Sequence, residues 1–205
     1  MKKNKTSKDW VIKQHRDQYF KQAKSSGFRS RSAYKLLELN KKFKIFKNCK
    51  TVIDLGSYPG GWSQILRKYL KGGKILSIDI KKMEKIEGVE FLCCDFLQAD
   101  SKNRILKTLK KKADLIVSDM AADTTGNKDL DCIRTNALCA DVLEFSRNVI
   151  SQNGVVVAKL FNGQDFLSVK TFAKNNFHKV SFFKPDSSRD YSKETYIHCE
   201  RIKTL

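Results

Sequence analysis

The 205-residue sequence has little proline or glycine and no long apolar segment. Two prolines and ten glycines exclude a low-complexity or collagen-like chain. No stretch approaches the roughly 18 consecutive apolar residues of a membrane span, and the N-terminus lacks the apolar segment of a secretory signal. We therefore expect a globular protein that contacts no membrane and resides in the cytoplasm, with an organelle matrix as the alternative.

Metal-binding patterns are also missing from the sequence. The six cysteines form no CxxC pair, and none of the three histidines stands at a zinc-finger spacing. Cys93 and Cys94 are adjacent, which suits neither an ordinary disulfide nor a tetrahedral metal site. We expect reduced thiols, no bound metal and a monomeric chain.

Acidic residues are scarce near the N-terminus. Residues 1–50 contain 16 basic and 3 acidic side chains, so this quarter carries +13 of the net charge of +19. Such a concentrated positive field attracts a polyanion. Residues 1–28 have few apolar positions, so we predict a basic arm there and a single domain over 29–205. Arginines can hold phosphates and stack on bases, which favours RNA over a membrane and makes Arg16, Arg29 and Arg31 candidate RNA-binding residues.

Short apolar runs alternate with longer amphipathic segments, a pattern typical of βα units in a mostly parallel sheet. A helix is predicted from Ser30, and Ser32 is expected to cap it. Strands are predicted at 51–55, 74–79, 89–94, 113–118 and 154–161, and helices near 61–70, 101–111, 131–151 and 164–175. The last two strands, 180–184 and 194–199, have no helix between them and should pair antiparallel. We predict an α/β fold: five βα units and a closing hairpin form one Rossmann-like seven-stranded sheet with an antiparallel last strand and helices on both faces.

An acidic residue ends each of four successive predicted strands: Asp54, Asp79, Asp95 and Asp119. Ligands in open α/β sheets bind beyond the carboxyl ends of the strands. The first of these acids begins the turn DLGSYPGGW, whose Gly56, Gly60 and Gly61 allow close approach of a ligand and positive φ angles. The turn has neither the GK[ST] of a Walker loop nor the GxGxxG of a nicotinamide site.

The later acids indicate an adenosine. Asp79 is placed to accept hydrogen bonds from both ribose hydroxyls, Asp95 could accept one from the adenine amino group, and Phe96 could stack on the ring. No phosphate contact is needed, which points to S-adenosylmethionine, whose product is S-adenosylhomocysteine. Capping of the following helices explains one such acid more easily than all four.

Lys159 interrupts the apolar run GVVVAKLF. A lysine in a buried strand needs a carboxylate partner or a lowered pKa. Methylation of a ribose hydroxyl requires that the hydroxyl lose its proton, and a lysine base would need a pKa lowered by about three units, or roughly 4 kcal/mol. Lys35 could assist as a second cation, with Asp119 steering and Glu194 balancing the charge.

Several motifs resemble the FtsJ family of RNA 2′-O-methyltransferases. They are, in collinear order, YKL at 34–36, DLGSYPGGWSQ at 54–64, SDMA at 118–121, AKLF with Gly163, and KPDSSR with KETYI at 184–197. The resemblance implies a catalytic tetrad of Lys35, Asp119, Lys159 and Glu194. It also implies cofactor contacts on the first loop, so the predicted cofactor-binding set is Asp54, Gly56, Pro59, Gly60, Gly61, Trp62, Asp79, Asp95, Phe96 and Asp119. By the same resemblance, the acceptor is expected to be a uridine of large-subunit rRNA.

The sequence differs from the family motifs at two places, and alternative functions remain. Ala122 and Asp123 stand where the family usually has proline and asparagine, and Ser57 and Tyr58 stand where two alanines are common, so the loop geometry and the substrate are less certain. Methylation of a base amino group usually needs an [ND]PP[YF] motif, which is missing. Carbon-5 methylation needs a cysteine nucleophile; SDMAAD contains none, and Cys132, the nearest cysteine in the sequence, leaves this option open. A tRNA 2′-O-methyltransferase or a non-catalytic RNA-binding assembly factor remains as an alternative.

Overall fold

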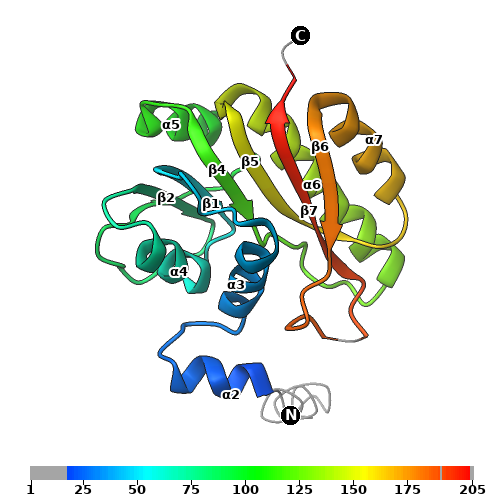
Figure 1. Ribbon diagram of the computed structural model, residues 1–205. Coiled ribbons are helices and arrows are strands. Elements are labelled where there is room, and N and C mark those ends of the chain that lie inside the picture. The colour runs from blue at the N-terminus through cyan, green and yellow to red at the C-terminus, as the bar shows by residue number, and fades with distance from the viewer. Residues whose placement is uncertain (1–17, 190, 204–205) are drawn as a thin grey trace.

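The computed structural model describes residues 18–189 and 191–203, so Arg16 lies outside the described residues. Seven strands form one sheet (Figure 1): β1 (Thr51–Leu55), β2 (Lys74–Asp79), β3 (Glu90–Cys93), β4 (Ala113–Ser118), β5 (Ile150–Phe161), β6 (Phe177–Phe183) and β7 (Glu194–Ile202). The described helices are α2 (Gln18–Ser25), α3 (Ser32–Phe43), α4 (Gly61–Tyr69), α5 (Ala99–Leu109), α6 (Lys128–Val149) and α7 (Phe166–Asn176). In the described part of the chain, no helix is both long and apolar enough to cross a membrane.

The strand order, β3-β2-β1-β4-β5-β7-β6, confirms the predicted sheet. Neighbouring strands from β3 to β5 pair parallel, whereas β7 pairs antiparallel with both β5 and β6. Two details of the prediction were wrong. The connection from β2 to β3, residues 80–89, contains no helix, so four βα units precede the hairpin instead of five. Ser32 is the first residue of α3 and not its cap, because Arg31 stands at the cap position without a side-chain hydrogen bond.

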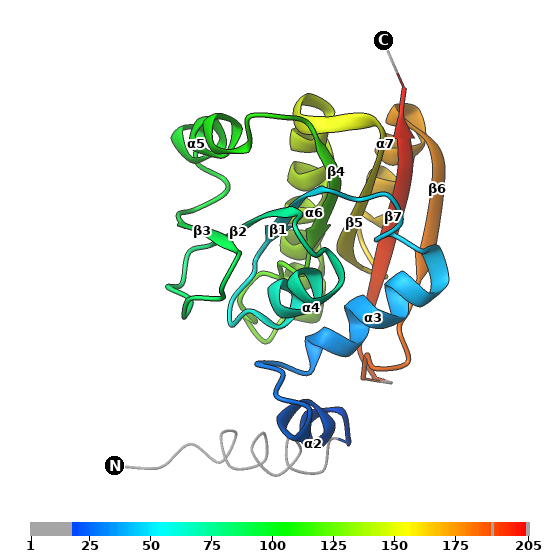
Figure 2. The ribbon, with the colours of Figure 1, turned by 60° about the vertical axis from the view of Figure 1, so that its left-hand side comes forward.

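Helices cover both faces of the sheet, as the sequence predicts (Figure 2). One core cluster joins α3 and α4 to one face, and a larger cluster joins α5, α6 and α7 to the other. The alternation of side chains along each strand divides the core between the faces: Val157 packs beneath α3 and α4, and Val156 packs on the opposite side. Every apolar residue of β1 and β4 is therefore buried on one face or the other.

The described part of the N-terminal arm forms α2, which lies below the carboxyl ends of the parallel strands in Figure 1. Ala23 is buried, and the ring of Tyr19 lies 5.6 Å from that of Tyr34 on α3. Phe28 packs edge-on against the same tyrosine, at 5.7 Å. The arm thus rests on the helix that carries Lys35, and the predicted domain boundary at residue 28 stays a prediction.

Candidate active site

Four predicted catalytic residues from four separate elements meet at the carboxyl edge of the sheet. The Lys159 ammonium on β5 lies 2.7 Å from Asp119 Oδ1 and 3.5 Å from Glu194 Oε2. It also donates to the Asp119 carbonyl at 2.9 Å. Lys35 on α3 contacts both oxygens of Glu194, at 2.7 and 2.8 Å. The site is a chain of alternating charges, Asp119–Lys159–Glu194–Lys35.

The strand period explains why these side chains share one face. Lys159 follows Val157 by two residues, and Glu194 precedes Tyr196 by two, so each points to the side that α3 and α4 cover. In the antiparallel ladder Lys159 pairs directly with Tyr196, and Phe161 pairs with Glu194. Glu194 therefore lies diagonally across from Lys159 on the same face, and α3 brings Lys35 over both.

Ion pairing decides the charge of Lys159. Burial disfavours the ammonium, but the carboxylates of Asp119 and Glu194 outweigh burial and raise the lysine pKa above its ordinary value. Burial likewise opposes ionisation of Asp119, but the cations of Lys159 and Lys35 lower its pKa. The expectation of a lowered lysine pKa is thus wrong for the protein without ligands, and the alternative, a carboxylate partner, is correct.

Two hydroxyl groups complete the site, and the sequence analysis missed both. The fully buried Tyr196 donates from its hydroxyl to Asp119 Oδ1 at 2.5 Å. The Ser188 hydroxyl donates to Glu194 Oε1 at 2.7 Å. Tyr196 could have been found from the sequence, because it lies two residues after Glu194 on the same face of β7. Ser188 could not, because it comes from the irregular β6–β7 loop.

The strand-end acids fit an adenosine-type cofactor to different degrees. Each oxygen of Asp79 accepts a backbone N–H at 2.8 Å, from Tyr58 and from Lys81, so the carboxylate is held in a fixed orientation. Asp54 Oδ2 accepts from Ser63, whereas its buried Oδ1 has no hydrogen-bond partner among the described residues. Burial raises the pKa of Asp54 to about 7. Asp54 is only 1% exposed, so its carboxylate is not open to a ligand, and its contact with a cofactor stays a prediction.

The structure does not support stacking of Phe96 on an adenine. Its side chain is 3% exposed, packs edge-on against Phe145 at 5.2 Å, and belongs to the core beneath α5 and α6. Asp95 beside it accepts a hydrogen bond from the Leu97 amide at 2.9 Å, and its side chain remains half-buried. The contact of Asp95 with an adenine amino group therefore stays a prediction.

The glycines of the first loop serve more than one purpose. Gly56 and Gly60 have φ angles of 76° and 111°, as predicted, but Gly61 does not, because it begins α4. A Cβ on Gly61 would lie 2.2 Å from Ser30 Oγ, and one on Gly60 would meet Arg29 at 2.9 Å. These two glycines therefore admit the segment before α3.

Trp62 and Pro59 also face this segment. Trp62 is 2% exposed, and its indole N–H donates to the Ser32 carbonyl at 2.7 Å. The Pro59 carbonyl accepts from Arg29 at 3.3 Å. Both predicted cofactor residues thus have structural partners on the chain before α3, and the Trp62 side chain is not open to a ligand.

The two described arginines of the predicted RNA-binding set lie against backbone carbonyls. Arg29 donates to the carbonyls of Pro59, Glu84 and Lys85, and Arg31 donates to that of Ser187 in the β6–β7 loop. Contact of these arginines with RNA stays a prediction. Their visible role is to join loops around the site.

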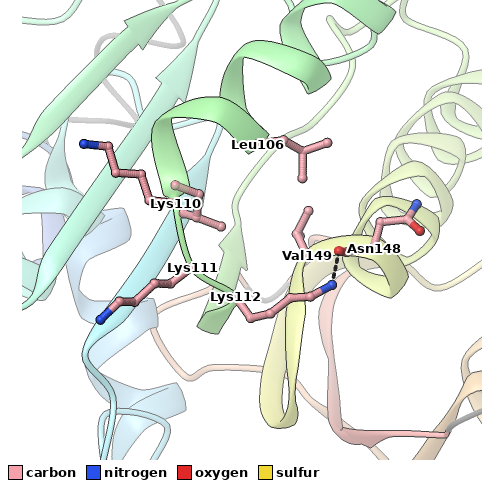
Figure 3. A pocket seen from close by; sticks show the side chains of 7 residues that line it. Leu106, Lys110, Lys111, Lys112, Asn148 and Val149 are labelled. Atoms are coloured by element: carbon pink, nitrogen blue, oxygen red, sulfur yellow. Dashed lines mark hydrogen bonds between the residues drawn. The ribbon is translucent and has the colours of Figure 1, made fainter.

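A cavity of about 460 Å³ lies between the C-terminal ends of α5 and α6 (Figure 3). Apolar side chains and the lysines 110–112 line it, and Lys112 donates to the Asn148 carbonyl at its rim. These helices lead into the amino ends of β4 and β5. The cavity is therefore at the sheet edge opposite Asp119, away from where open α/β sheets bind ligands. Among the residues that the structure describes, no group of three His, Cys, Asp or Glu side chains could hold a metal.

Comparison with known proteins identifies the family of this chain. Residues 28–202 match the model of the FtsJ-like methyltransferase family. The ribosomal RNA large subunit methyltransferase E of Pelagibacter ubique is 45% identical over 203 residues, which cover 99% of this chain and 100% of that protein. A crystal structure described as a ribosomal RNA methyltransferase from Plasmodium falciparum has a TM-score of 0.76 and 31% identity, covering 85% of this chain and 98% of that one.

A more distant structure shares the fold alone. Human methyltransferase-like protein 13, solved in complex with SAH, has a TM-score of 0.58 at 14% identity and covers 82% of this chain and 79% of that one. The family match spans most of the chain, and the similarity to the Pelagibacter protein extends over nearly all of it. The chain therefore belongs to the FtsJ-like methyltransferase family.

Proposed function

We propose that this methyltransferase transfers the methyl group of S-adenosylmethionine to a ribose 2′-hydroxyl of large-subunit ribosomal RNA. The observation that carries the proposal is the buried Lys159 ammonium between Asp119 and Glu194, with Lys35 on the far side of Glu194. An inert buried ion pair contributes little net stability compared with apolar residues of similar volume. Two lysines and two carboxylates at the ligand-binding edge instead indicate proton handling.

When bound, the cofactor would supply an electrophilic sulfonium methyl group, and its sulfur would keep the electron pair of the carbon–sulfur bond. The residues of the chain would position the ribose 2′-hydroxyl and take its proton. We expect Asp79 and Asp95 to hold the adenosine. The neutral amine of Lys159 would take the proton of the attacking 2′-hydroxyl. A cationic ligand nearby favours the neutral amine, because like charges disfavour each other.

The acceptor assignment rests on charge and on the relatives. The excess of basic residues near the N-terminus favours an RNA acceptor. The name of the Pelagibacter relative specifies the large-subunit rRNA. A tRNA acceptor has the same chemistry, so only the identity of the methylated RNA distinguishes it.

Labelled S-adenosylmethionine tests the proposal with assembled large subunits, naked rRNA and tRNA as separate acceptors. We expect label on a ribose 2′-oxygen of large-subunit rRNA, and its loss in Lys159→Met. Lys179→Met is the matched control, because this lysine also pairs with a carboxylate on a strand but is 53% exposed and lies on β6. Transfer that survives Lys159→Met, or label on a base atom, would contradict the mechanism. RNA binding without transfer would favour the assembly-factor alternative.

A further inference from the structure

The segment between α2 and α3 crosses over the predicted cofactor loop, and Arg29 lies at the crossing. Its Nη1 donates to the carbonyls of Pro59 at 3.3 Å and Glu84 at 2.7 Å, and its Nη2 donates to that of Lys85 at 3.1 Å. Pro59 belongs to the loop after β1, and the other two belong to the loop after β2. One guanidinium thus joins both loops that flank Asp79.

Further hydrogen bonds fasten the same crossing. The Arg29 amide donates to Gln64 Oε1 at 2.8 Å, and Gln64 Nε2 returns a bond to the Gly27 carbonyl at 3.2 Å. The Trp62 indole donates to the Ser32 carbonyl. The start of α4 is therefore held to the segment that leads into the helix of Lys35.

The loop after β1 is held from two sides. Asp79 accepts from the Tyr58 amide, and Arg29 donates to the next carbonyl, that of Pro59. Gly60 leaves space at this point, because a Cβ there would lie 2.9 Å from both Arg29 Nη1 and Met83 Sδ. Removing the guanidinium would therefore release the side of the loop that Asp79 does not hold.

We propose that Arg29 is a positioning residue of the cofactor pocket and that its guanidinium does not contact RNA. The inference rests on the proposed function, since it takes the pocket between these loops to bind S-adenosylmethionine. Three carbonyls in different directions require the planar fork of arginine, which a lysine ammonium does not reproduce. Shape, and not charge alone, is the property that this position requires.

Binding of S-adenosylhomocysteine, measured by calorimetry without RNA, tests the inference. We expect Arg29→Lys and Arg29→Ala to weaken binding by about tenfold or more, since each loses charge-assisted bonds to both loops. Two controls should stay within about twofold of wild type. Glu84→Gln removes only an exposed carboxylate 3.8 Å from Arg29, and Lys24→Ala removes one exposed charge from α2.

RNA binding distinguishes positioning from phosphate contact. Arg29→Lys should leave RNA affinity and its salt dependence unchanged. Thermal unfolding of each variant identifies a temperature at which the variant is folded, and the titrations are done there. If wild type and Arg29→Lys bound S-adenosylhomocysteine equally well, the positioning role of Arg29 would be overturned and the proposed function would stand. An Arg29→Lys variant that loses only RNA affinity would overturn the positioning role as well. Wild-type protein that binds no S-adenosylhomocysteine would overturn the proposed cofactor, and the inference with it.

Discussion

Replacing Tyr196 with phenylalanine should weaken both the fold and the reaction. The change removes one hydroxyl that donates to Asp119 Oδ1 at 2.5 Å inside a fully buried site. A hydrogen bond to a charged group contributes about 1.5–3 kcal/mol, and Asp119 keeps its contact with Lys159. We therefore expect a loss of about 2 kcal/mol. In a chain of this size, that loss lowers Tm by about 4–8 °C.

The same change alters the charge balance of Asp119. Burial opposes its ionisation, the two lysines lower its pKa, and the tyrosine hydroxyl lowers it further. A carboxylate with a depressed folded-state pKa stabilises the protein above its unfolded pKa, and this contribution is lost as pH falls through the folded pKa. Without the hydroxyl the folded pKa rises, so acid unfolding of Tyr196→Phe should begin at a higher pH than in wild type.

The assays are thermal unfolding at several pH values and steady-state methyl transfer at varied RNA concentrations. We expect kcat to fall about tenfold with little change in KM, because the tyrosine orients Asp119 and does not touch the substrate. Tyr191→Phe is the matched control, since its ring is 75% exposed. If Tyr196→Phe matched that control in Tm, in acid unfolding and in kcat, the hydroxyl would not hold Asp119 in place.

Two further predictions concern buried titratable groups. Asp54→Asn removes a carboxyl group. Burial raises the pKa of this group from 3.8 to about 7, and a carboxyl group whose folded-state pKa is raised stabilises the protein less as pH rises. The variant should therefore gain stability over wild type as pH rises from about 4 to about 7, by up to about 4 kcal/mol, and equal pH dependence of the two in thermal unfolding would refute this. The methyl-transfer rate should rise with pH through the neutral range, because the carboxylates keep Lys159 charged and only its neutral amine accepts a proton. A rate that stays flat in single-turnover measurements would exclude Lys159 as the base.

Local sequence patterns were enough to predict the sheet and much of the candidate site. Strand alternation and helix periodicity arise from backbone geometry, which depends on near neighbours in the chain. Strand β1, for example, begins and ends at the predicted residues. A lysine inside an apolar run and acids at successive strand ends are equally local signals, and the fold brings Lys159 and Asp119 within 2.7 Å.

The tertiary structure decided what each side chain does. Arg29 was a candidate for RNA binding because of its charge; it lies against carbonyls 30 to 56 residues away in the sequence, and its contact with RNA stays a prediction. Phe96 was predicted to stack on a ligand from its neighbour Asp95, yet it lies in the core. The sequence by itself thus determined the number of strands, their order along the chain and the acids at the ends of four of them. Only tertiary packing determined which loops meet and which side chains are covered, because those contacts join residues far apart in the sequence, which strand and helix periodicity cannot predict.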